Sequence, residues 1–174
     1  KRLSGSFARF RRAALWPRCV AGALGAADAP IHVSGHSSGA HLAATLLDAR
    51  WPDGAGLVAS ALLVSGAYDL QPVRASARNS YLTLDAAEAE ALSPVVAPRP
   101  VPTAVFSAER DLDEFRRQSA LFASALRTAG APVLERTVVG RDHFEIYDLM
   151  GEPGGAPAQT ARALMAGRAP CDIS

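Results

Sequence analysis

The sequence predicts an α/β fold, a mostly parallel sheet with helices on both faces, from three observations. Short runs that are apolar throughout recur along the 174-residue chain, as in strands buried on both faces. Stretches with apolar residues at helical spacing lie between these runs. The hydrophobic share of 49% and the charged share of 20% are ordinary for a globular protein. Strands that alternate with helices in this way form a parallel sheet between two layers of helices.

Each expected element follows from its own pattern of residues. The basic start of the chain is expected to be a helix with a solvated face. Right-handed crossovers would place the strands side by side in chain order. The predicted strands are 31–33, 61–66, 103–107 and 133–139. The predicted helices are 38–50, a short one at 86–91, 113–128 and 160–165.

The net charge and the cysteine content indicate which kinds of binding partner and which cellular compartment to expect. The formal net charge of +1 gives no electrostatic case for binding nucleic acid or an anionic membrane. No apolar run approaches the roughly 20 residues that a membrane-spanning helix needs. Cys19 and Cys171 lie far apart and fit no metal or redox spacing, which suits a reducing cytoplasm. We therefore expect a cytoplasmic protein that acts on a small molecule.

The strongest functional signal is the segment Gly35-His36-Ser37-Ser38-Gly39. It matches the G-x-S-x-G nucleophile elbow, with the required strand before it and helix after it. The serine of an elbow occupies a sharp, strained turn, so we expect small residues to be needed at both Gly35 and Gly39. The start of the helix would direct the backbone N–H of Ser38 at the reacting carbonyl, as one donor of an oxyanion hole. Ser37 is therefore the predicted nucleophile.

A base and an acid for this serine follow it in the order typical of the α/β-hydrolases. A serine hydroxyl is a poor nucleophile and needs a base that a third group holds. Asp111 comes directly after the third predicted strand, and His143 after the fourth. Both would lie at the carboxyl edge of the sheet. His143 would accept the serine proton, and Asp111 would orient and stabilise the imidazolium.

Other carboxylates compete with Asp111 for the role of acid. Glu109 and Asp113 are close enough in the sequence to replace it. Asp69, after the second strand, is a further candidate, because some hydrolases place the acid there. His143 has no comparable rival as base.

Three further histidines, His32, His36 and His41, surround the nucleophile in the sequence. Imidazole is a zinc ligand, so a metal site is conceivable from the residue types. Their positions on a strand, in a turn and on a helix point them in different directions. We therefore expect no metal, and the predicted chemistry needs no organic cofactor.

The connection 71–102 is long and rich in Pro, Ala and Ser. A connection of this length over the carboxyl edge of a sheet often shapes a binding site. It is the expected place for substrate recognition, although a tolerated insertion would look the same.

Several stretches stand together in an order typical of one family. They are the elbow segment 35–44, the segment 65–72, parts of the connection (Asn79, Leu82, Leu84-Asp85 and Leu92-Ser93-Pro94), and the acid and base segments 111–119 and 140–144. Together they resemble the kynurenine formamidase (arylformamidase) family of the α/β-hydrolase superfamily, over about residues 31–146. Alanine commonly occupies the place of Ser38 in that family.

The resemblance implies hydrolysis of N-formyl-kynurenine to kynurenine and formate in tryptophan catabolism. It carries over Ser37, Asp111 and His143 as catalytic residues and requires no cofactor. A carboxylesterase of the same superfamily, acting on small esters, is the first alternative. A non-catalytic remnant is the second, since the family's His-Gly-Gly segment, which supplies other oxyanion donors, does not occur in this sequence.

The same comparison predicts how the chain is organised. We expect a single, partial α/β-hydrolase domain over 1–174 that corresponds to the C-terminal part of the family. Residues 1–29 would form the helix that precedes the elbow strand, and 30–174 the catalytic part, with the N-terminal strands of the sheet missing. The sheet would then have an exposed edge strand, through which two copies of the chain could pair as a homodimer.

Overall fold

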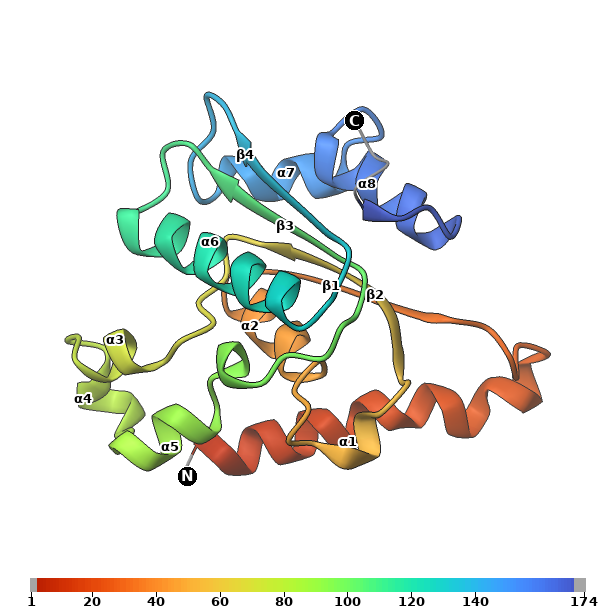
Figure 1. Cartoon of the computed structure of the whole chain (residues 1–174), viewed down its shortest axis with the longest axis horizontal. Helices are drawn as coiled ribbons and strands as arrows, with labels where there is room; N and C mark the ends of the chain where they lie inside the picture. The colour runs from red at the N-terminus through yellow and green to blue at the C-terminus, as the bar shows by residue number, and fades with distance from the viewer. Residues whose placement is uncertain (1–2, 171–174) are drawn as a thin grey trace.

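The computed structural model describes residues 3–170 and builds them around one parallel sheet (Figure 1). Neighbouring strands pair in parallel in the order β1-β2-β3-β4, which confirms the predicted arrangement. Cys171 lies outside the described residues, so the expectation about the two cysteines is tested only at Cys19, an exposed free thiol. The strands are β1 (Ile31–His36), β2 (Val58–Val64), β3 (Thr103–Ala108) and β4 (Val133–Val138).

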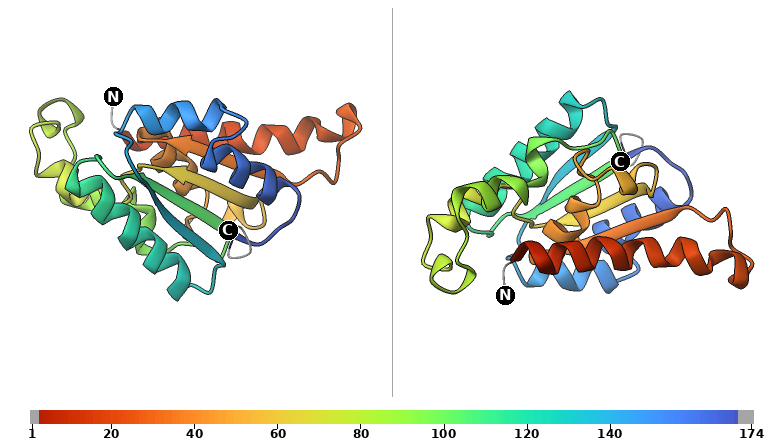
Figure 2. Two further views of the ribbon diagram at one scale, coloured as in Figure 1. Left: turned by 90° about the horizontal axis from the view of Figure 1, so that it is seen from above. Right: turned by 90° about the horizontal axis from the view of Figure 1, so that it is seen from below.

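Helices cover both faces of this sheet, as predicted (Figure 2). One face packs against α2 (Ser38–Thr45) and α6 (Asp113–Thr128). The other packs against α7 (Glu145–Gly151) and α8 (Ala156–Met165). The long α1 (Leu3–Ala21) adds Phe10 and Ala14 to the core on the α2 side.

Successive residues of the central strands enter two different cores. Leu63 and Val105 belong to the core beneath α2 and α6, whereas Leu62 and Phe106 belong to the core beneath α7 and α8. All four are at most 3% exposed. The alternation of side chains on a strand therefore explains why β2 and β3 are apolar throughout.

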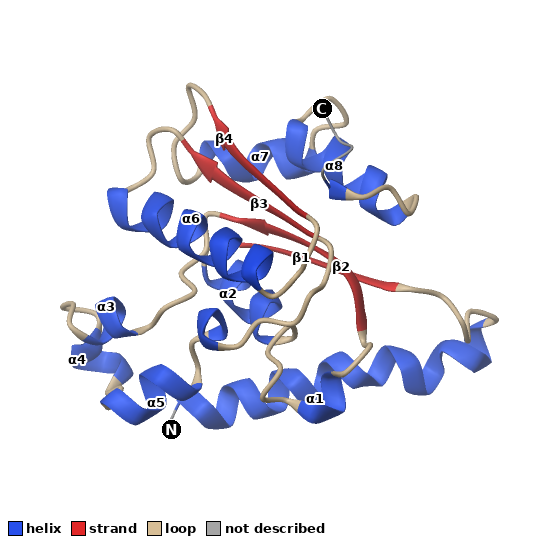
Figure 3. Ribbon diagram, in the orientation of Figure 1, coloured by secondary structure: helices blue, strands red, loops and turns tan. Residues whose placement is uncertain are grey.

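The connection between β2 and β3 forms several short helices that lie near the N-terminal end of α1 (Figure 3). Leu70, Leu84 and Leu92 from this connection pack with Phe7 of α1 in a third, smaller core. The elements of this connection are α3 (Gln71–Arg74), α4 (Asn79–Leu82), the predicted α5 (Ala86–Ala91) and the 3-10 turn Pro94–Val96. Two other 3-10 turns, Gly22–Leu24 and Pro52–Gly54, lie earlier in the chain.

Several helices differ from the expectation. The helix expected over 1–29 ends at Ala21, and α8 begins at Ala156, four residues before the predicted helix 160–165. The predicted helix 38–50 ends at Thr45, because the chain then turns so that the buried carboxylate of Asp48 binds Arg11 and Arg50. Helices α3, α4 and α7 were not expected. No helix within the described range is both long enough and apolar enough to span a membrane.

Candidate active site

Ser37 lies at the sharp turn between β1 and α2. Its backbone angles, φ 55° and ψ −121°, fall in a region that residues with side chains rarely adopt. The Ser37 N–H donates a hydrogen bond to the Val64 carbonyl at 2.9 Å, which ties the turn to the end of β2. This strained turn exposes the hydroxyl at the carboxyl edge of the sheet.

The two glycines of the elbow have different reasons to be there. A Cβ added at Gly35 would lie 2.3 Å from the carbonyl oxygen of Gly39, so only glycine lets α2 start directly over β1. A Cβ added at Gly39 would meet no described atom within 4 Å. The expectation that lack of space requires both glycines is therefore correct for Gly35 and wrong for Gly39.

The side chains of Ser37, His143 and Asp111 form one hydrogen-bonded chain. His143 Nε2 lies 3.0 Å from Ser37 Oγ, and His143 Nδ1 lies 2.7 Å from Asp111 Oδ1. The Asp111 side chain is fully buried, and the His143 side chain is 18% exposed. Phe115 stacks on the His143 ring with 4.4 Å between ring centroids. The structure thus brings together the three residues that the sequence singled out.

The second oxygen of Asp111 has two hydrogen-bond donors of its own. Ser65 Oγ donates to Asp111 Oδ2 at 2.6 Å, and the Ala108 N–H donates to the same oxygen at 2.9 Å. Together with His143, these bonds satisfy a buried charge and hold the plane of the carboxylate. Ser65 is fully buried and has a positive φ of 49°. No role was predicted for Ser65 from the sequence, although it begins the segment 65–72 that contributes to the family resemblance.

The other candidate acids are engaged elsewhere. Asp113 has a side chain that is 96% exposed and pairs with Arg116. Glu109 accepts a hydrogen bond from the Gly140 N–H, and Asp69 accepts one from the Gln71 N–H. Among the described carboxylates, Asp111 is the one bonded to the His143 ring.

Reciprocal hydrogen bonds between Asp142 and Glu145 hold the turn that carries His143, just before α7. Asp142 Oδ1 accepts hydrogen bonds from the Phe144 and Glu145 N–H groups, both at 2.9 Å. Glu145 Oε2 accepts one from the Asp142 N–H at 3.0 Å, which completes the reciprocal pattern. The backbone donors Glu145 and Phe144 lower the pKa of Asp142. The spacing Asp-x-x-Glu at 142–145 was thus the sequence signal for this helix.

The remaining histidines make three separate sets of contacts. The ring of His36 bonds through Nε2 to the His143 carbonyl at 2.7 Å, and burial lowers its pKa. His32 Nδ1 lies 2.7 Å from Ser60 Oγ, and His41 Nδ1 bonds to the Ala67 carbonyl. Within residues 3–170, no group of three or more His, Cys, Asp or Glu side chains could hold a metal ion.

A cavity of about 380 Å³ opens beside Ser37. The first half of α1, the start of α2, the connection after β2 and Phe115 of α6 all contribute to its wall. Burial lowers the pKa of His41 in this wall to about 4, so its ring is neutral at pH 7. The lining residues are mostly apolar: Leu3, Ser6, Phe7, Ser37, Ser38, His41, Leu42, Ala67, Leu70, Val73, Arg78, Tyr81, Leu82 and Phe115.

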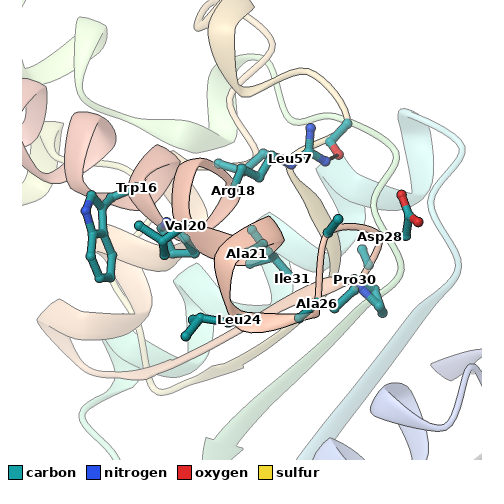
Figure 4. A pocket seen from close by; sticks show the side chains of 15 residues that line it. Trp16, Arg18, Val20, Ala21, Leu24, Ala26, Asp28, Pro30, Ile31 and Leu57 are labelled. Atoms are coloured by element: carbon teal, nitrogen blue, oxygen red, sulfur yellow. Dashed lines mark hydrogen bonds between the residues drawn. The ribbon is translucent and has the colours of Figure 1, made fainter.

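A larger cavity, of about 750 Å³, lies away from these residues (Figure 4). Trp16 of α1 and Leu24 of the 3-10 turn after it line this cavity, and Ile31 and Leu57 line it near the amino ends of β1 and β2. Neither the nucleophile nor its partners contribute to its wall. Ligands of α/β sheets bind at the carboxyl ends of the strands. The smaller cavity is therefore the candidate substrate site.

Comparison with solved structures identifies the fold. An esterase from Pyrobaculum calidifontis superposes with a TM-score of 0.70 at 23% identity, over 100% of this chain and 63% of that chain. EstE1, a carboxylesterase cloned from a metagenomic library, gives 0.71 at 19% identity, over 96% of this chain and 65% of that one. The chain has the α/β-hydrolase fold.

Comparison with curated sequences points to one family within this fold. Kynurenine formamidase from Danio rerio is 36% identical over 127 residues, which cover 68% of this chain and 43% of that protein. The enzyme of the same name from Salmo salar is 34% identical over 128 residues, covering 68% and 44%. These similarities confirm the resemblance to the kynurenine formamidases. The chain spans less than half the length of these relatives. No family model matches it.

In this fold, Ser38 lies directly after the predicted nucleophile, at the start of α2. It is the first residue of α2, so its N–H is one of the donors that a helix leaves free at its start. The helix dipole adds positive potential at the same point. The Ser38 side chain lines the cavity, but an oxyanion would use only its N–H.

Proposed function

We propose that the chain is a serine hydrolase that cleaves an aryl formamide, N-formyl-kynurenine, to kynurenine and formate, in tryptophan catabolism. The observation that carries this proposal is the hydrogen-bonded chain from Ser37 through His143 to Asp111 beside an apolar cavity. The similarity to the kynurenine formamidases supports the choice of a formamide. A cytoplasmic location is part of the proposal, and the exposed free thiol of Cys19 supports it.

The reaction would begin with attack of Ser37 on the formyl carbon. His143 Nε2, 3.0 Å away, takes the hydroxyl proton as the new C–O bond forms. The Ser38 N–H stabilises the negative oxygen of the tetrahedral intermediate. Asp111 remains ionised and holds the His143 ring in orientation, as its bond to Nδ1 allows.

The intermediate would then collapse by breaking its C–N bond. The His143 imidazolium donates its proton to the aryl nitrogen, so that kynurenine leaves as a neutral aryl amine. A formyl ester on Ser37 remains. Water, deprotonated by His143, attacks this ester and releases formate, and the proton returns to Ser37. A formyl carbon is the least hindered acyl centre, and an aryl amine leaves more readily than an alkyl amine.

The proposal is tested by turnover of two substrates by the 174-residue chain. N-formyl-kynurenine and p-nitrophenyl acetate are incubated with the wild-type chain, Ser37→Ala and Ser38→Ala. We expect formamide hydrolysis in the wild type, loss of at least about a thousandfold in Ser37→Ala, and retention in Ser38→Ala, which keeps its backbone N–H.

Two outcomes would contradict the proposal in different ways. Ester turnover without formamide turnover would identify a carboxylesterase, the alternative that the fold similarity to esterases favours. A folded chain with no turnover of either substrate would identify a non-catalytic remnant.

A further inference from the structure

Among the described residues that line the cavity beside Ser37, one side chain carries a permanent charge. That charge is Arg78; the other lining residues are apolar or uncharged at neutral pH, His41 included. The Arg78 side chain is exposed, and no residue in the described part of the chain pairs with its guanidinium. An apolar cavity with one convergent cation suits a ligand with an apolar body and one anionic group.

The short helix after Arg78 is held in place by side-chain bonds. Arg78 immediately precedes α4, and Tyr81 and Leu82 of the same helix also line the cavity. Asn79 Oδ1 accepts a hydrogen bond from the Leu84 N–H at 2.7 Å, and Asn79 Nδ2 donates to the Leu84 carbonyl at 3.1 Å. These bonds close the turn around α4 and fix the backbone that presents Arg78. The cation therefore projects from an ordered part of the cavity wall.

We propose that Arg78 binds a carboxylate on the amine side of the substrate, so that the site selects aryl formamides that carry an acid group. This inference rests on the proposed function. N-formyl-kynurenine fits the requirement, because its aryl ring bears a side chain that ends in an amino acid. A guanidinium matches a carboxylate with two parallel hydrogen bonds, which gives orientation as well as attraction. The apolar wall receives the ring, and Ser37 receives the formyl group.

The proposal is tested with one variant at Arg78 and one control variant, each assayed with two substrates. Arg78→Met removes the charge and keeps an apolar stem. Arg74→Met is the matched control, because Arg74 is exposed at the end of α3, does not line the cavity, and bonds to Gln71. N-formyl-kynurenine is compared with formanilide, a neutral aryl formamide without a carboxylate.

We expect Arg78→Met to raise KM for N-formyl-kynurenine about three- to tenfold, as for a partly solvated ion pair, with kcat nearly unchanged. Formanilide kinetics should be the same in Arg78→Met and wild type, and Arg74→Met should change neither substrate. Equal effects on both substrates, or no change in KM for the acidic one, would overturn the inference.

Binding separates this inference from the proposed function. Calorimetry measures the affinity of L-kynurenine and of kynuramine, its decarboxylated analogue, for the wild type and for Arg78→Met. Tighter binding of L-kynurenine that Arg78→Met abolishes supports the carboxylate site even where no formamide is hydrolysed. Equal affinity for the two ligands in the wild type contradicts it even where formamide turnover is intact.

Discussion

Two neighbouring regions at the carboxyl edge of the sheet are built in opposite ways. In the first, Ser37, His143, Asp111 and Ser65 are joined by hydrogen bonds of 2.6–3.0 Å, and each polar atom has a defined partner. In the second, the cavity beside them is mostly apolar, with Arg78 as its single described charge. Phe115 belongs to both, because it stacks on His143 and lines the cavity.

The contrast separates two tasks. Hydrogen bonds are directional and need particular atoms at particular strand ends, so the first region can activate a hydroxyl. An apolar wall holds a shape and admits any group of suitable size, so the second region can select a substrate only through its outline and its charge. Substitutions in the first region should therefore change kcat, and substitutions in the second should change KM or stability.

The largest effect is expected at Asp111. Asp111→Asn keeps the shape of the side chain but removes the charge that stabilises the His143 imidazolium, and it favours the wrong tautomer of the ring. We expect kcat to fall about 10⁴-fold, with KM changed little. Steady-state kinetics with N-formyl-kynurenine measures both constants.

Asp113→Asn is the control for this substitution, because Asp113 is two residues away and its side chain is 96% exposed. It should retain nearly full kcat. A larger loss in Asp113→Asn than in Asp111→Asn would show that the acid has been assigned to the wrong carboxylate.

A smaller effect, on stability, is expected at His41 in the cavity wall. Burial lowers the pKa of His41 to about 4 in the folded chain, against an ordinary value of 6.5. Well above pH 6.5 the His41 ring is neutral in both the folded and the unfolded chain. Its protonation then takes nothing from the free energy of unfolding. As the pH falls from 6.5 to about 4, the unfolded chain binds a proton that the folded chain does not. The resulting loss is about 3 kcal/mol of the free energy of unfolding.

Urea unfolding at pH 7.5 and pH 4.5 measures this loss. His41→Asn serves as the reference, because an amide can replace the donor at Nδ1 but does not titrate. The wild type should lose more stability between the two pH values than the variant does. An equal loss in both proteins would mean that His41 does not contribute to the pH dependence.

The smallest effect is expected at Ser65, a positioning residue that acts through Asp111. Ser65→Ala removes one of the three hydrogen bonds to the carboxylate and should lower kcat about ten- to a hundredfold, with KM unchanged. Ser65→Gly removes the same hydroxyl but adopts the positive φ without strain. Full kcat in Ser65→Gly beside a reduced kcat in Ser65→Ala would assign the effect to backbone strain instead.

The sequence predicted the first region far better than the second, and the reason is physical. The elbow is a local motif, and Asp111 and His143 each lie in the loop just after a strand, so a parallel sheet brings them to one edge. The contact of Ser65 with Asp111 depends on the packing of two strand ends, and no local pattern encodes it. The early end of α2 likewise depends on Asp48 and its distant partner Arg11.

The cavity could not be predicted because its wall combines segments far apart in the chain. Residues of α1, α4 and α6 meet there only after folding. The sequence indicated that the connection 71–102 was the place for recognition, and Arg78 does lie in it. It gave no reason to prefer Arg78 over Arg74, since both are arginines on short polar segments.

The proposed mechanism depends above all on whether Ser37 is an activated nucleophile. A fluorophosphonate probe reacts with a serine hydroxyl only where a base withdraws its proton, and mass spectrometry locates the modified residue. We predict labelling of Ser37 at neutral pH in the wild-type chain and its loss in a folded His143→Ala variant. Absence of label from the folded wild-type chain, or equal labelling of Ser37 in the wild type and in His143→Ala, would contradict the assignment of Ser37 as an activated nucleophile.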